Sequence, residues 1–76
     1  MEQTVVVSIN IKGKTEKASI KFLDKNLKNI HIVESNKNAI TIEWKLAETQ
    51  EIHDVEEELY YLLRDGSLGD YELIEG

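Results

Sequence analysis

The sequence predicts an α+β fold, in which a four-stranded antiparallel meander is followed by one C-terminal amphipathic helix packed on one face (ββββα). Two observations lead to this prediction. Residues 4–46 contain runs in which apolar and polar side chains alternate, as they do in half-buried strands. From residue 49 the apolar residues recur every three or four positions, which is the period of an α-helix. The chain has 76 residues and no Pro- or Gly-rich linker, so we expect one domain, residues 1–76.

The first two alternating runs, residues 4–12 and 15–23, are expected to form a β-hairpin. Residues 13–14 (Gly-Lys) suit a two-residue type II′ turn, which favours glycine in its first position. This turn places Val7 opposite Ile20, so that apolar residues meet on one face. A shift by one residue would turn the apolar set of one strand toward solvent, so the pattern predicts this register.

The third and fourth runs, residues 29–34 and 39–46, are expected to form a second hairpin. Their apolar residues match when Ile32 lies opposite Ile42. Trp44 then points inward, and we expect it to be mostly buried beneath the helix.

The helix is expected to follow Thr49, a favourable N-cap residue, and to end at Gly66. Residues 70–75 have two alternatives. They form a short fifth strand beside residues 4–11, or two copies of the chain pair edge to edge as a symmetric dimer. The tail strand is favoured because the tail is already tethered to the sheet.

Charge and composition exclude several classes of protein. The net charge of −6 divides into +3 over residues 1–31 and −9 over residues 32–76. The absence of cysteine excludes disulfides, thiolate metal sites and a cysteine nucleophile, and it favours a reducing, cytoplasmic location. No apolar run reaches about 18 residues, so we expect no membrane contact through a spanning helix.

Motifs for catalysis and cofactor binding are weak. Residues 13–15 (Gly-Lys-Thr) resemble the end of a phosphate-binding loop, but Ser8 replaces its first glycine and a strand is expected to follow. His53 and Glu57 have a spacing that can bind a metal, although a site needs further converging ligands. We therefore expect a protein that is not an enzyme and has no cofactor and no metal.

The favoured function is that of a small acidic, non-enzymatic binding or regulatory protein. It would act through protein–protein contact, using the acidic helix or a sheet edge, on a partner protein with a basic surface; a homodimer is a second form of such contact. The expected protein-binding residues are Glu51, Asp54, Glu57, Glu58, Tyr60, Tyr61 and Tyr71.

The alternative is a nucleic-acid-binding module that uses a lysine-bearing exposed face of the sheet. The expected contacts are Lys12, Lys17, Lys21 and Lys45. Sheets that bind single strands usually stack bases on aromatic side chains. Because the only Phe and the only Trp are expected to point into the core, nucleic acid is the less favoured partner.

Overall fold

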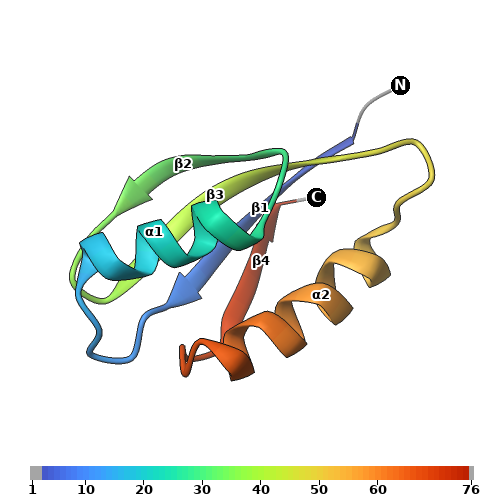
Figure 1. Ribbon diagram of the computed structural model, residues 1–76. Helices are drawn as coiled ribbons and strands as arrows, with labels where there is room; N and C mark the ends of the chain where they lie inside the picture. The colour runs from blue at the N-terminus through green and yellow to red at the C-terminus, as the bar shows by residue number, and fades with distance from the viewer. Residues whose placement is uncertain (1–2, 76) are drawn as a thin grey trace.

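The computed structural model describes residues 3–75, which form a sheet and two helices in the order β-α-β-β-α-β (Figure 1). The elements are β1 (Gln3–Asn10), α1 (Glu16–Asn26), β2 (Ile30–Ser35), β3 (Ala39–Leu46), α2 (Ile52–Asp65) and β4 (Tyr71–Glu75). The strands are all antiparallel, in the order β2-β3-β1-β4. This is the split β-α-β arrangement called ferredoxin-like, which occurs with many unrelated functions.

The predicted ββββα order is therefore wrong. A helix, α1, replaces the second predicted strand, and α2 lies between β3 and β4 in the chain rather than after all the strands. The predicted first hairpin is wrong as well, because Val7 lies opposite Ile42 of β3 and not opposite Ile20. The Gly13 turn exists, with φ at +81°, but it leads from β1 into a helix.

Helix α1 forms because its start and its buried stripe both suit a helix. The Thr15 hydroxyl accepts the N–H of Ala18 at 3.2 Å, which is an N-cap bond. Ser19 and Leu23, four residues apart, are buried on one side of the helix, and Leu27, its C-cap residue, is buried as well. The serine makes this stripe hard to see in the sequence, where the apolar alternation between residues 18 and 22 imitates a strand.

Strand β1 lies inside the sheet, between β3 and β4. It pairs with β3 from Gln3–Leu46 through Asn10–Ala39. On its other side β4 pairs with β1, with Leu73 opposite Val7. The predicted tail strand beside residues 4–11 is thus confirmed, although it is the fourth strand of this sheet and not a fifth.

The second predicted hairpin is confirmed. Ile32 lies opposite Ile42, and the register shifts after Ile32 because of a bulge on β2. Asn36 shapes the turn, since its Oδ1 accepts the N–H groups of Asn38 and Ala39 at 2.7 and 2.9 Å.

Both helices lie on the same side of the sheet, and the core fills the space between these two layers (Figure 1). The buried side chains are Val5, Val7, Ile9, Ile11, Leu23, Leu27, Ile40, Ile42, Trp44, Leu46, Val55, Leu59, Leu63 and Leu68. The helices also meet each other: a Cβ added to Gly66 would lie 2.5 Å from the ring of Phe22. The glycine therefore allows α1 to approach the end of α2.

The ends of α2 differ from the prediction. Its N-cap is Glu51 and not Thr49, and the Glu51 N–H donates to Asp54 Oδ2 at 2.9 Å. At the other end Gly66 keeps a right-handed helical conformation, and Ser67 takes the left-handed one with φ at +56°. The Asp54 carboxylate lies in the first turn, where it suits the positive end of the helix dipole, and its bond to the N-cap residue fixes the start of α2.

Replacement of Trp44 by alanine tests the core. Trp44 is 2% exposed, so we expect Trp44→Ala to lower the free energy of unfolding by about 3–5 kcal/mol. Urea unfolding followed by circular dichroism measures this change. Tyr61→Ala, which removes an exposed ring, is the matched control and should change stability by less than about 0.5 kcal/mol. Equal effects of the two substitutions would contradict the burial of Trp44.

Replacement of Ser19 by alanine should stabilise the protein. Ser19 is 2% exposed, and its hydroxyl has no hydrogen-bond partner within the described residues. Because alanine removes a buried unpaired polar group and favours a helix, we expect a gain of about 1 kcal/mol. The urea midpoint should rise with an unchanged slope. Thr15→Ala, which removes the N-cap bond of the same helix, should instead cost about 1 kcal/mol. A loss of stability in Ser19→Ala would show that the hydroxyl is bonded.

Candidate interaction surface on α2 and β4

The outward side of α2 presents two tyrosines to solvent. Tyr60 and Tyr61 are 59% and 58% exposed. Their ring centroids are 5.3 Å apart and the rings are almost perpendicular, so each covers part of the other. Exposed aromatic side chains are enriched where proteins bind one another.

A hydrogen bond connects α2 to β4. The hydroxyl of Tyr71, which is half-buried on β4, donates to Glu56 Oε2 at 2.9 Å. Burial raises the pKa of Tyr71 above its usual value of 10.0, and the bond to Glu56 and the charge of that carboxylate raise it further. The sequence placed Tyr71 in the predicted interface, but no sequence signal linked it to Glu56.

A small pocket of about 220 Å³ lies where α2 and the start of β4 meet. Its lining residues are Tyr60, Leu63, Arg64, Leu68, Gly69, Asp70 and Tyr71. Farther along β4, Leu73 and Ile74 are 36% and 57% exposed. Exposed apolar side chains therefore lie on both α2 and β4. We call Tyr60, Tyr61, Tyr71 and Leu73 the α2–β4 surface.

The acidic residues predicted to bind a partner have different local roles. Glu51 and Asp54 form the start of α2. Glu57 lies 3.7 Å from His53, and both side chains are mostly exposed. Glu58 is also exposed. All four acidic residues are exposed, at the N-cap and in the first half of α2, so this part of the helix is negatively charged.

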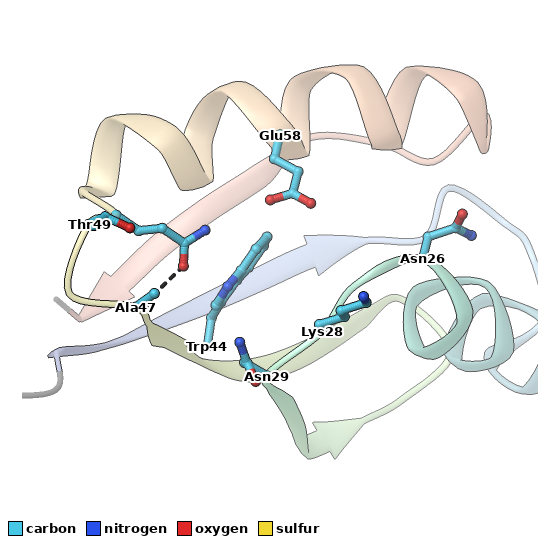
Figure 2. Close-up of a pocket in the computed structure, with 8 residues that line it drawn as sticks. Asn26, Lys28, Asn29, Trp44, Ala47, Thr49 and Glu58 are labelled. Carbon is cyan, nitrogen blue, oxygen red and sulfur yellow. Dashed lines mark hydrogen bonds between the residues drawn. The ribbon is translucent and has the colours of Figure 1, made fainter.

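A larger pocket of about 460 Å³ opens at the other end of α2 (Figure 2). Its lining residues are Asn26, Lys28, Asn29, Trp44, Ala47, Thr49, Gln50 and Glu58. Figure 2 shows Glu58 extending from α2 toward the pocket and the Trp44 ring standing between α2 and the sheet. The lining residues come from separate parts of the chain, so no local pattern could have predicted this pocket.

The lysine-bearing sheet face predicted for nucleic acid does not form. Lys17 and Lys21 lie on the exposed side of α1, and Lys12 lies in the turn after β1. Lys45 is exposed on β3, where the neighbouring residues of the sheet include Glu43 and His31. The physical reason is the folding of residues 16–26 as a helix, which removes two lysines from the sheet.

Residues 13–15 were expected to precede a strand, and that expectation is wrong because α1 follows them. The segment nevertheless differs from a phosphate-binding loop. The Thr15 hydroxyl is bonded to the N–H of Ala18, and Ser8 lies within β1 opposite Thr41. These residues form a short turn between a strand and a helix.

Within residues 3–75, there is no group of three or more His, Asp or Glu side chains that could hold a metal ion. None of the helices in this range is long and apolar enough to cross a membrane.

Replacement of Tyr71 by phenylalanine tests the link between α2 and β4. We expect Tyr71→Phe to cost about 1 kcal/mol at neutral pH, because the hydrogen bond to Glu56 is lost. Tyr61→Phe is the control, since Tyr61 is exposed and its hydroxyl makes no hydrogen bond to any residue that the structure describes.

The native protein and Tyr71→Phe should also differ in how their stability depends on pH. The folded protein keeps the Tyr71 proton at pH values where the unfolded chain has lost it, because the folded pKa is raised. The stabilisation is complete below pH 10.0, the unfolded pKa, and it is lost as the pH rises through the folded pKa. Urea unfolding above pH 10 should thus show a steeper loss in the native protein than in Tyr71→Phe. If the free energy of unfolding fell equally steeply with pH in the native protein and in Tyr71→Phe, the raised pKa of Tyr71 would be contradicted.

The chain matches no family model, and it matches neither a curated protein nor a solved structure. A proposal for its function therefore depends on the geometry and charge of its own surfaces.

Proposed function

We propose that this chain is a small non-enzymatic binding protein that acts through contact with another protein, and that the α2–β4 surface makes that contact. One observation supports the proposal most: Tyr60 and Tyr61 are exposed on α2 and pack against each other. Tyr60 and Tyr71 also line the same pocket. Tyrosine side chains bury much area on binding and lose little conformational entropy, which makes them effective interface residues.

The negative charge of α2 supports a partner with a basic surface. Glu51, Asp54, Glu57 and Glu58 are exposed at the N-cap and in the first half of the helix that carries Tyr60 and Tyr61. Protein interfaces commonly join aromatic residues with polar, solvent-accessible ones nearby. The carboxylates would attract a basic partner and repel acidic ones, so their main effect would be on association rate and specificity.

Catalysis has less support from the geometry. His31 is exposed on β2, whereas His53 lies on α2, so the two imidazoles belong to different layers of the fold. His53 has Glu57 as its neighbour, but both side chains are mostly in water. An active site normally requires a nucleophile and a base that converge in a pocket.

The proposal can be tested by affinity capture from an extract of the native source. A tagged chain is compared with the double variant Tyr60→Ser/Tyr61→Ser, and bound proteins are quantified by mass spectrometry. Loss of two exposed aromatic contacts should reduce capture of the partner about tenfold or more. The matched control is Lys17→Ser/Lys21→Ser, which changes two exposed positions on the other helix and should leave capture unchanged.

The control also separates the two candidate functions. If the tyrosine variant captured its partner as well as the native chain did, the α2–β4 surface would not be the contact. If the lysine variant alone lost binding, and the native chain bound a single-stranded oligonucleotide with steep salt dependence, nucleic acid would be the partner instead.

A further inference from the structure

Strand β4 has an unpaired edge. Within residues 3–75, β4 is the last strand of the sheet and has β1 on one side only. The Asn10 N–H donates to the Asp70 carbonyl at 2.9 Å. Because bonded positions alternate in an antiparallel ladder, Glu72 is the next residue bonded to β1. The N–H and C=O groups of Tyr71 and Leu73 consequently point away from β1, where another strand can pair with them.

The β4 edge is better suited to an added strand than the edge at β2. The bulge on β2 falls between Ile32 and Glu34, in the middle of that strand, and such bulges protect edges from pairing. On β4 the register shift comes after Leu73, so residues 71–73 remain regular. The 220 Å³ pocket beside Tyr71 also offers space for an apolar side chain of the incoming strand.

The two sides of β4 have different chemistry. Tyr71 and Leu73 lie opposite the buried residues Ile9 and Val7, so they are on the helix-bearing side of the sheet. Glu72 is exposed on the open side. Since side chains alternate along a strand, an added strand would meet apolar surface on one side and a carboxylate on the other.

A second copy of this chain fits the edge poorly. If two copies paired antiparallel about Glu72, this residue would face the Glu72 of the second copy. If they paired about Tyr71, Glu72 would face Asp70, and pairing about Leu73 would extend into the irregular part of β4 that follows Leu73. Like charges directly opposite one another destabilise a strand pair, and each chain also carries a net charge of −6. The charge therefore favours a different, basic partner.

We propose that the β4 edge binds an extended segment of a partner protein in which apolar residues alternate with Lys or Arg. The segment pairs with the backbone of Tyr71 and Leu73 and extends the sheet by one strand. Its apolar side chains lie on the helix side, against Tyr60 and Tyr71, and a basic side chain lies beside Glu72. This proposal rests on the function proposed above and specifies the partner that the α2–β4 surface takes.

The test uses the full chain and a synthetic capped peptide of about six residues, a usual strand length, in which Lys and Val alternate. Binding is followed by NMR, through the amide shifts of residues 70–74, and by slower hydrogen exchange of the Tyr71 and Leu73 amides. Glu72→Lys should weaken binding about three- to tenfold, because an attractive cross-strand pair becomes repulsive. The matched control is Glu34→Lys, which makes the same charge change on β2 at the opposite edge and should leave the affinity unchanged.

Leu73→Pro tests the backbone pairing directly. Proline removes the outward N–H at Leu73 but leaves the bonds between β4 and β1, so the fold should persist while peptide binding is lost. Native Trp44 fluorescence confirms that each variant is folded. Three results would each overturn the proposal. Leu73→Pro could bind the peptide normally, or Glu34→Lys could weaken binding as much as Glu72→Lys does. The third is that millimolar peptide shifts no amide of residues 70–74 in the native chain. Such a result would not overturn the proposed function if the native chain still captured a partner and the Tyr60→Ser/Tyr61→Ser variant did not.

Discussion

The fold depends on the burial of β1 in the middle of the sheet. Its inward side chains Val5, Val7 and Ile9 have no exposed surface, and β3 and β4 pair with its two edges. A strand with neighbours on both edges needs cover only on its apolar face, and the two helices provide that cover. This arrangement accounts for the position of β4: the tail returns beside β1 because β1 would otherwise expose a long, regular edge.

The candidate surface is a consequence of the way α2 covers the sheet. Val55, Leu59 and Leu63 form the buried stripe of this helix, so Tyr60 and Tyr61 must point elsewhere. After the helix the chain turns at Ser67 and enters β4, which brings Tyr71 back alongside α2. The bond from Tyr71 to Glu56 then joins the two elements. Side chains from a helix and from a sheet edge thereby form one surface that mixes aromatic groups with carboxylates.

Local patterns were sufficient for several parts of this structure. The alternation in residues 29–46 predicted the β2–β3 hairpin with Ile32 opposite Ile42, and the inward position of Trp44. The spacing of apolar residues from residue 49 predicted an amphipathic helix, and α2 does bury one side, at Val55, Leu59 and Leu63. The pockets and the Tyr71–Glu56 bond could not be predicted in this way, since each depends on elements that meet only after folding.

Local sequence patterns were enough to predict a helix within residues 49–66, the second hairpin, and a strand formed by the tail. Only tertiary contacts decided whether residues 16–26 form a strand or a helix. Their apolar residues fit a strand with Ile20 opposite Val7, and they also fit a helix with Ser19 and Leu23 inward. Pairing of β1 with β3 resolved that choice, since Ile42 occupies the place beside Val7. The physical reason is that an apolar residue gains by burial against any apolar neighbour, so burial alone does not specify the partner.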